Sequence, residues 1–132
     1  MKFGYTILYV DDVEATLSFY GKAFGLKQKM LHKTEDGNAY GELDTGETTL
    51  SFAARRFVGS HISIPVQKGG LGNDPPAVEV ALVGEDVQAA FDKAIAAGAT
   101  PVQNPSKKPW GQVVGYVRDN NGFLVELCSP VG

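Results

Sequence analysis

The feature that most constrains the fold of this chain is a pattern that occurs twice, with an offset of about 74 residues. In the first copy, a strand-like run at Tyr5–Val10 precedes Asp12, a residue type that favours the start of a helix. The apolar residues that follow are spaced by four, three and four positions, which places them on one helix face: Val13, Leu17, Tyr20 and Phe24. Gly25 then provides a typical helix end. The sequence therefore predicts a strand followed by a helix.

The rest of the first copy is predicted to form three strands joined by tight turns. The strand-like runs cover residues 27–34, 38–43 and 48–53. Between them, residues 35–38 and 44–47 combine acidic or polar residues with glycine, a composition typical of hairpin turns. The first copy is therefore expected to be a βαβββ unit.

The second copy repeats these elements in the same order. A strand-like run at residues 78–83 precedes Asp86, and the helix that follows ends at Gly98; its apolar face consists of Val87, Phe91, Ala94 and Ile95. Strand-like runs then occupy residues 101–103, 112–118 and 123–128, with a turn at residues 119–122. Because helix starts, helix ends and turns all recur at offsets of 73 to 75 residues, the chain is predicted to contain an internal duplication.

The length of 132 residues is that of one domain, and the element pattern assigns it to the α+β class. We expect residues 1–132 to form a first unit at 1–53, a connector at 54–76 and a second unit at 77–132. The connector has no clear period, is rich in glycine and contains Pro75-Pro76. Such a segment is either a plain linker or a lid over a binding site, and both interpretations stay open.

Composition excludes several classes of function. The net charge of −3 leaves no basic field for nucleic acid. The single cysteine, Cys128, excludes an internal disulfide and a cysteine-bound zinc site, and its apolar neighbours favour a buried structural thiol. No apolar run approaches the ~18 residues of a membrane span, and no signal peptide is recognisable. We therefore expect a cytoplasmic domain that binds neither nucleic acid nor membranes.

Two runs carry a resemblance to a known family. Residues 5–27 read YTILYVDDVEATLSFYGKAFGLK, and residues 117–130 read VRDNNGFLVELCSP. With the paired βαβββ plan, they resemble the vicinal oxygen chelate superfamily, which includes glyoxalase I, the bleomycin-resistance proteins, the fosfomycin-resistance enzymes and the extradiol dioxygenases. The resemblance implies an open, curled barrel of mixed β-sheet with the helices outside. It also implies that two units pair to enclose a cavity, and that the chain forms a homodimer.

Members of this superfamily that use a metal take its ligands from the first and last strands of each unit. The resemblance places these positions at Tyr5, Ser51, Glu79 and Glu126. A phenol and a hydroxyl are poor ligands for a borderline metal, so only two strong ligands remain. His32 and His61 lie outside these positions and are expected to be surface histidines. We therefore expect no metal and no other cofactor, and an extradiol dioxygenase is excluded.

The two carboxylates at these positions need an explanation. Strand alternation places Glu126 on one face with Leu124, and burying an unpaired carboxylate is costly. Two carboxylates about 4 Å apart repel each other by about 4 kcal/mol at an effective dielectric constant near 20. Either an internal cation pairs with them, with Arg118, Arg55 or Arg56 as candidates, or a cationic ligand binds there. Both explanations stay open.

The predicted cavity combines flat aromatic and aliphatic surfaces with a few polar groups, as small-molecule pockets do. Its expected lining is Tyr5, Ile7, Tyr9, Ser51, Phe57, Glu79, Trp110, Val114, Tyr116, Leu124 and Glu126. The leading hypothesis is metal-free binding or sequestration of a small ligand, with a cationic one as a candidate, as in the bleomycin-resistance proteins. The alternative is a glyoxalase-type lyase or isomerase that holds nickel, zinc or manganese at Glu79 and Glu126. A third class is a dimeric module without a ligand, and whether the protein is an enzyme stays open.

Overall fold

The computed structural model describes residues 1–131, apart from the side chains of residues 57, 59 and 60. The chain divides into two compact units, Met1–Lys68 and a second unit that begins at Gly69. Each unit contains one four-stranded mixed sheet. The two sheets have equivalent strand orders, β1-β4-β3-β2 and β5-β8-β7-β6, so the predicted α+β fold of two βαβββ units is confirmed.

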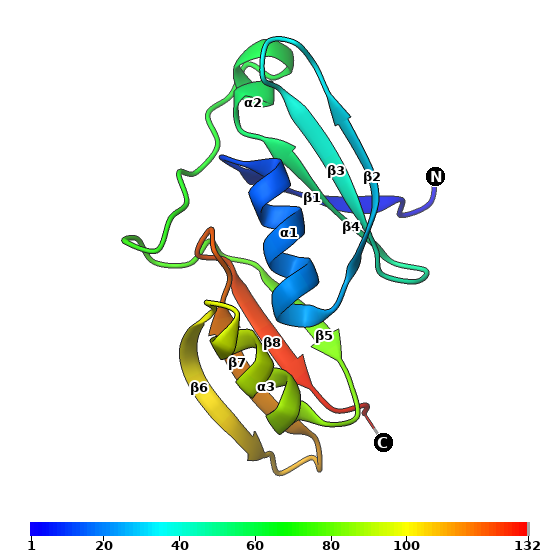
Figure 1. The fold of residues 1–132 in the computed structure, drawn as a ribbon, viewed down its shortest axis with the longest axis vertical. Helices are drawn as coiled ribbons and strands as arrows, with labels where there is room; N and C mark the ends of the chain where they lie inside the picture. The colour runs from blue at the N-terminus through cyan, green and yellow to red at the C-terminus, as the bar shows by residue number, and fades with distance from the viewer. Residues whose placement is uncertain (132) are drawn as a thin grey trace. The chain divides into compact units, whose positions relative to one another are not determined.

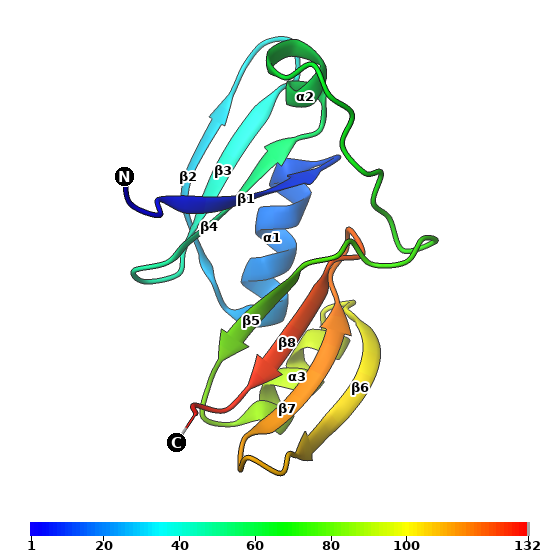
Figure 2. The same ribbon diagram turned by 180° about the vertical axis from the view of Figure 1, so that it is seen from behind.

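The first unit is one sheet with one long helix packed against a face of it (Figure 1). Its elements are β1 (Tyr5–Val10), α1 (Val13–Phe24), β2 (Lys27–Lys33), β3 (Ala39–Asp44), β4 (Thr49–Ala54) and α2 (Arg56–His61). Strand β1 runs parallel to β4, and the other neighbouring strands are antiparallel. Figure 2 shows the sheet from behind, on the side away from α1.

Helix α1 forms where the sequence predicts it. The Asp12 side chain accepts a hydrogen bond from the Ala15 amide at 3.0 Å, and Gly25 ends the helix in the left-handed conformation at φ 70°. The helix packs closely on β3 because Gly41 has no side chain. A Cβ atom at Gly41 would lie only 2.7 Å from Cδ1 of Leu17. Behind this contact lies the core of the unit, which contains Leu8, Val10, Leu17, Tyr20, Leu43 and Phe52.

The second unit repeats this arrangement. Its elements are β5 (Glu79–Val83), α3 (Val87–Ala96), β6 (Thr100–Lys107), β7 (Val113–Arg118) and β8 (Leu124–Cys128). The Asp86 side chain caps α3 by accepting from the Ala89 amide at 3.0 Å. One face of the sheet packs against the apolar side of α3, and the resulting core contains Val87, Phe91, Ala94, Val117, Val125 and Leu127. Helix starts at Asp12 and Asp86 are thus confirmed.

The ladder registers show how closely the two units correspond. In the first unit Ile7 of β1 pairs with Ser51 of β4, and in the second unit Ala81 of β5 pairs with Glu126 of β8. These pairs occupy equivalent rungs of two parallel ladders. Ser51 and Glu126 therefore occupy equivalent positions in the two units, but one carries a hydroxyl and the other a carboxylate.

Two elements differ from the sequence prediction. Strand β6 runs over Thr100–Lys107, well beyond the predicted residues 101–103, because the ladder tolerates Pro101 and Pro105 on an edge strand with two register shifts. The predicted connector contains helix α2, which the sequence analysis missed. Helix α2 has six residues and no side-chain cap. It therefore lacks both the capping residue and the long run of spaced apolar residues that predict α1 and α3.

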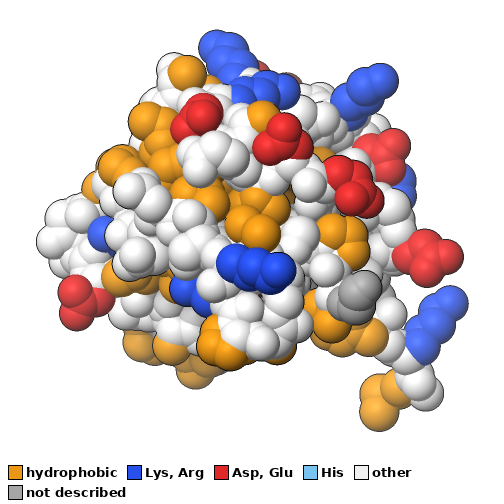
Figure 3. Space-filling view, turned by 90° about the horizontal axis from the view of Figure 1, so that it is seen from below, with side chains coloured by type: hydrophobic (Ala, Val, Ile, Leu, Met, Phe, Trp, Pro, Cys, Tyr) orange, Lys and Arg blue, Asp and Glu red, His pale blue; other side chains and the backbone are white. Residues whose placement is uncertain are grey.

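The length of the helices in the described residues, and the distribution of charge on one face, bear on the predictions about membranes and nucleic acid. Among these residues, no helix is long and apolar enough to cross a membrane. On the face shown in Figure 3, lysine and arginine side chains are interspersed with acidic and hydrophobic ones and form no single continuous patch.

Candidate functional site

One face of the first-unit sheet packs against α1, and the other face is uncovered. On the uncovered face, three residues form a row across the strands, with a tyrosine at each end and an alanine in the middle. Alternation along β1 directs Tyr5, Ile7 and Tyr9 to this face, whereas Leu8 and Val10 are buried under α1. In the ladder, Tyr9 pairs with Ala53, and Ala53 pairs with Tyr40. Because strands lie about 4.8 Å apart, two tyrosines flank a single methyl group across about 10 Å of sheet.

A cavity of about 300 Å³ lies over this row. Its lining is Tyr5, Ile7, Tyr9, Tyr40, Ala53, His61 and Ile62. His61 and Ile62 come from the end of α2 and the residue after it, so the connector supplies one wall. None of the lining residues is a lysine or an arginine. The cavity is therefore mostly aromatic and aliphatic, with polar groups at its edges.

Tyr40 is the most constrained of these aromatic residues. Its hydroxyl donates a 2.7 Å hydrogen bond to Oε2 of Glu42, which lies on the same face of β3. The ring stands edge-on to the ring of Tyr5, with centroids 6.5 Å apart and an interplanar angle of 63°. Burial, reinforced by the Glu42 carboxylate, raises the pKa of Tyr40 to about 12. Tyr40 is therefore a neutral hydrogen-bond donor at physiological pH.

Ser51 lies beneath this cavity in the next row of the ladder. It is fully buried, and its hydroxyl donates a 2.8 Å hydrogen bond to the carbonyl oxygen of Thr6. It pairs with Ile7 on one side and with Glu42 on the other. The hydroxyl of Ser51 thus ties β4 to β1 inside the sheet, and Ser51 does not line the cavity.

The equivalent face of the second unit carries a cluster of acidic groups. Tyr116 and Glu126 stand directly opposite each other on β7 and β8, and the Tyr116 hydroxyl donates a 3.0 Å hydrogen bond to Oε1 of Glu126. Glu79, at the start of β5, is on the same face. Burial and the charge of Glu126 raise the pKa of Glu79. The face therefore presents two carboxylates that repel each other.

Burial also controls the other two titratable groups beside Glu126. It raises the pKa of Tyr116 to about 12, with further contributions from the hydrogen bond to Glu126 and from its charge. It raises the pKa of the Cys128 thiol to about 11, again with Glu126 contributing. Both side chains are therefore neutral donors beside the Glu126 carboxylate.

No internal cation compensates these carboxylates. Among the described residues, neither Glu79 nor Glu126 forms an ion pair. Arg118, one of the candidate cations, does not pair with them, because its guanidinium is held by backbone carbonyls instead. Its Nε donates to the Gly122 oxygen at 2.9 Å, and its two terminal nitrogens donate to carbonyl oxygens of Gly70, Leu71 and Asn73.

The other two candidate arginines are also engaged elsewhere. The Nε of Arg55 forms an ion pair with Asp11 at 2.9 Å. A terminal nitrogen of Arg56 donates to the carbonyl oxygen of Asp36 at 2.7 Å. Both of these partners belong to the first unit.

The four positions that the family uses for metal ligands do not fit a metal of the glyoxalase type. Ser51 uses its proton on the Thr6 carbonyl, and Tyr5 offers a neutral phenol that is 54% exposed. Only Glu79 and Glu126 bring carboxylates. Within the described part of the chain, no three His, Cys, Asp or Glu side chains gather closely enough to hold a metal ion. The donor set is short of imidazole and carboxylate groups.

The remaining predicted cavity residues are scattered. Val114 is buried opposite Cys128, and Leu124 lies next to Glu79 on the ladder, so both border the acidic cluster. Trp110 lies in the turn between β6 and β7, is 65% exposed and donates from Nε1 to Gln112. It is not part of either cluster. The side chain of Phe57 lies outside the described residues.

The sequence analysis missed several residues of the first-unit cavity. Tyr40 and Glu42 alternate along a predicted strand, and that spacing could have revealed them. His61 and Ile62 reach the cavity through α2, which carries no sequence signal. His61 is exposed, as predicted, yet it borders the cavity. His32 is exposed on β2, as predicted.

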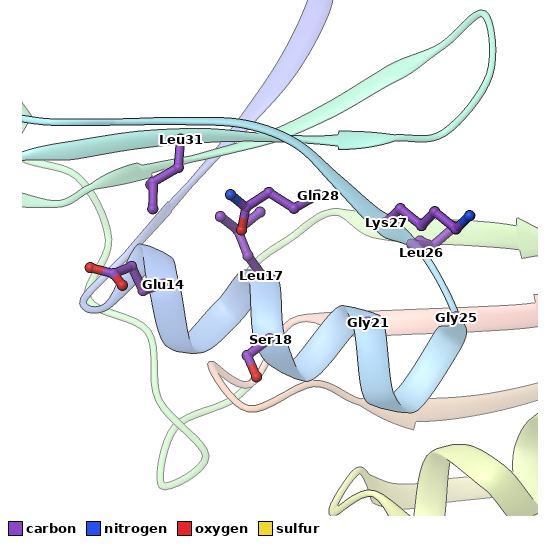
Figure 4. Close-up of a pocket in the computed structure, with 9 residues that line it drawn as sticks. All are labelled: Glu14, Leu17, Ser18, Gly21, Gly25, Leu26, Lys27, Gln28 and Leu31. Carbon is purple, nitrogen blue, oxygen red and sulfur yellow. The ribbon is translucent and has the colours of Figure 1, made fainter.

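A second hollow of about 710 Å³ lies between α1 and β2, on the side of the sheet away from Tyr40. Figure 4 shows Leu17 on the helix pointing toward Gln28 and Leu31 on the strand. Glu14 is already paired with Lys33. The hollow contains no aromatic side chain and no group of titratable residues, so the sheet faces described above are the better candidate site.

Comparison with protein families identifies the relatives of this chain. The family described as the glyoxalase/bleomycin resistance protein/dioxygenase superfamily matches residues 2–127. An uncharacterized protein of Mycobacterium bovis is 31% identical over 133 aligned positions, which cover 94% of this chain and 80% of that protein. An uncharacterized protein of Mycobacterium tuberculosis is equally similar and is covered over 72% of its length.

Solved structures share the fold. A glyoxalase-related enzyme from Fulvimarina pelagi superposes with a TM-score of 0.80 at 20% identity, covering 98% of this chain and 88% of that one. TioX from Micromonospora sp. ML1 superposes with a TM-score of 0.68 at 25% identity, covering 94% of each chain. These similarities establish the architecture, and the chemistry of the site rests on the residues described above.

Proposed function

Because the chain belongs to the glyoxalase/bleomycin resistance protein/dioxygenase superfamily, we propose that it binds a small molecule without a metal, in the manner of the bleomycin-resistance members. The ligand carries a positive charge that interacts with Glu79 and Glu126. Its apolar part contacts Tyr116 and Leu124, which lie beside these carboxylates on the uncovered face of the second unit.

The observation that supports this proposal best is the acidic cluster of the second unit. Glu79 and Glu126 lie on one face, the charge of Glu126 raises the pKa of Glu79, and no cation of the described residues pairs with either. A ligand with an ammonium group supplies the missing positive charge and removes the repulsion. The Tyr116 hydroxyl fixes one oxygen of Glu126 at 3.0 Å.

The donor set argues against the metal-dependent alternative. The position equivalent to Glu126 in the first unit is Ser51, whose hydroxyl is used inside the sheet. The position equivalent to Glu79 is Tyr5, a phenol with no charge to offer. Two carboxylates are a weak site for nickel or zinc, which prefer imidazole and thiolate ligands as well.

We also propose that the chain forms a homodimer, as the family resemblance implies. Apolar side chains on the uncovered sheet faces support this proposal, because Tyr5 is 54% and Val83 is 65% exposed. Apolar groups gathered in a contiguous patch are typical of interaction surfaces, and a dimer contact would bring such groups together. Sedimentation equilibrium at micromolar concentration is expected to give twice the mass of one chain, and a mass of 14.1 kDa would contradict the dimer.

Thermal denaturation with benzylamine tests the proposed function. The amine is expected to raise the melting temperature saturably, because a ligand that binds only the folded state stabilises it by about 2.7 kcal/mol at a hundred times its Kd. Benzyl alcohol, which has the same ring and no charge, is expected to have little effect. Glu126→Gln and Glu79→Gln are each expected to weaken benzylamine binding about tenfold or more.

Glu47→Gln is the matched control, because Glu47 is an exposed acidic residue in the turn between β3 and β4. It should leave benzylamine binding unchanged. Elemental analysis of protein purified without chelator tests the metal-dependent alternative. Stoichiometric nickel, zinc or manganese that disappears in Glu126→Gln would overturn metal-free binding.

A further inference from the structure

The first-unit cavity has an unusual combination of walls. Three tyrosine rings line it, and the rings of Tyr5 and Tyr40 meet at 63° rather than in a parallel stack. Ile7 and Ile62 close the remaining sides, and the methyl group of Ala53 forms the floor. The steep angle between the Tyr5 and Tyr40 rings forms a corner above this small floor, and a rounded group fits a corner better than a flat one.

Two hydroxyl groups beside this cavity are already bonded to protein partners. The hydroxyl of Tyr40 donates to Glu42, and the hydroxyl of Ser51 in the row below donates to the Thr6 carbonyl. Neither of these protons is available to a ligand. A ligand group that accepts no hydrogen bond loses nothing at these two positions.

The electrostatics of the cavity favour a positive charge. The Glu42 carboxylate accepts from Tyr40 and, among the described residues, forms no ion pair. Donation of a hydrogen bond to a carboxylate also increases the electron density of the phenol ring. Aromatic faces attract cations through their quadrupole, and quaternary ammonium groups are recognised in this way.

We propose that the first-unit cavity binds a quaternary alkylammonium group, with Tyr5, Tyr9 and Tyr40 as its walls and Glu42 as its counter-charge. The inference goes beyond the proposed function, because it assigns a second cation-binding site, on the uncovered face of the first unit. A primary ammonium group would gain most from hydrogen bonds to the carboxylates of Glu79 and Glu126. A quaternary ammonium has no N–H group and therefore interacts more favourably with aromatic faces.

Three small probes that share one hydroxyl group separate these chemistries. Choline carries the quaternary ammonium, ethanolamine carries a primary ammonium, and 3,3-dimethylbutan-1-ol replaces the charged nitrogen by carbon. In proton NMR titrations at about pH 8, the methyl resonance of choline is expected to move upfield saturably, because aromatic ring currents surround it. The neutral alcohol is expected to bind at least about tenfold more weakly, since it lacks the cation–π attraction.

Variants of one tyrosine separate the ring from the hydroxyl. Tyr40→Leu removes the ring and is expected to weaken choline binding about tenfold. Tyr40→Phe keeps the ring but releases Glu42, and should weaken binding about threefold. Glu42→Gln removes the counter-charge and should cost a similar factor, whereas Glu47→Gln, in the exposed turn, should cost nothing. If Tyr40→Leu fails to fold, the pair Tyr40→Phe and Glu42→Gln still tests the inference.

The outcomes distinguish this inference from the proposed function. The inference is overturned if choline and the neutral alcohol bind equally well. It is also overturned if choline binding is unaffected by Tyr40→Leu, or by both Tyr40→Phe and Glu42→Gln. If choline does not bind while benzylamine binds and depends on Glu126, the inference fails and the proposed function stands. If neither cation binds, both are wrong.

Discussion

The hydroxyl of Tyr116 donates a 3.0 Å hydrogen bond to the carboxylate of Glu126, directly across the antiparallel ladder of β7 and β8. In the first unit a phenol and a carboxylate also meet, but there Tyr40 and Glu42 lie on one strand, two residues apart. The duplicated units have thus placed a phenol–carboxylate pair on each uncovered sheet face by different routes. Both pairs hold a carboxylate oxygen without neutralising its charge.

The stability of the protein is expected to fall in strongly alkaline solution because of these two phenols. The pKa of each is raised to about 12 in the folded state, above the value of 10.0 for a free phenol. The folded state therefore favours the neutral phenols. Their contribution is fully present below about pH 10 and is lost as the pH rises through about 12.

Urea denaturation at several pH values between 9 and 12 measures this loss. The double variant Tyr40→Phe with Tyr116→Phe should show a smaller decline of the unfolding free energy over the same range, because it has no phenol at either position. An identical decline in both proteins would show that these phenols are not responsible.

Replacing Glu79 is expected to separate stability from binding. The raised pKa of Glu79 means that its ionised form is disfavoured in the folded state, mainly by burial and then by Glu126. Glu79→Gln should therefore raise the unfolding free energy at pH 7, by no more than about 0.5 kcal/mol after solvent screening. The same variant weakens binding of a cation. Denaturation of Glu79→Gln beside Glu47→Gln measures the first effect, and a loss of stability would contradict it.

Two turn glycines form a matched pair that tests the local geometry. Gly46 and Gly122 both have a left-handed backbone, with φ of 83° and 89°. A Cβ atom at Gly46 meets nothing within 4 Å, whereas one at Gly122 would lie 2.7 Å from Arg118 Nη2 and 2.8 Å from the Gly70 oxygen. Gly46→Ala should cost about 1 kcal/mol of backbone strain. Gly122→Ala should cost at least about 1 kcal/mol more. Equal melting temperatures would show that the Gly70 segment yields freely.

Arg118 is expected to hold residues 69–73 against the turn between β7 and β8. Its guanidinium donates to four backbone carbonyls, and the Gly70 amide adds a 2.8 Å hydrogen bond to the carbonyl of Asn121. Arg118→Lys keeps the charge but loses the planar set of donors, so it should cost about 1–3 kcal/mol. Arg55→Lys should cost less, because the Arg55 guanidinium donates to a single carbonyl, that of Gln67, beside its ion pair with exposed Asp11.

Hydrogen exchange checks this prediction directly. In Arg118→Lys the amides of residues 69–73 should exchange faster, while those of β1 to β4 should be unchanged. Unaltered exchange at Gly70 would show that the segment holds its place without the arginine.

The repeated elements could be predicted from the sequence because their signals are local. Asp12 and Asp86 cap their helices through side chains three residues from the amides they bind. Strand alternation likewise directs Tyr5, Ile7 and Tyr9 to one face. Such features depend on a few consecutive residues, and so the order of the elements and the family resemblance followed from them.

The partners of charged side chains could not be predicted, because they depend on residues far apart in the sequence. Arg118 is nearest in sequence to Glu126 among the arginines, yet its guanidinium contacts carbonyls 45 to 48 residues away. The cavity wall formed by Ile62 depends on α2, a helix without a capping side chain. The ligand-binding roles of the residues on both sheet faces stay predictions.

Because of its environment, the reactivity of the Cys128 thiol reports on local opening of the second unit. The thiol is buried, donates to the Leu82 carbonyl at 3.7 Å and has a pKa raised to about 11. The thiolate is the nucleophile that attacks alkylating reagents, so the folded protein, whose thiol stays protonated and buried, should resist them. Since Cys128 is the single cysteine of the chain, no other thiol competes for the reagent. The rate of its modification therefore measures how often β8 separates from its neighbours, without any label being introduced.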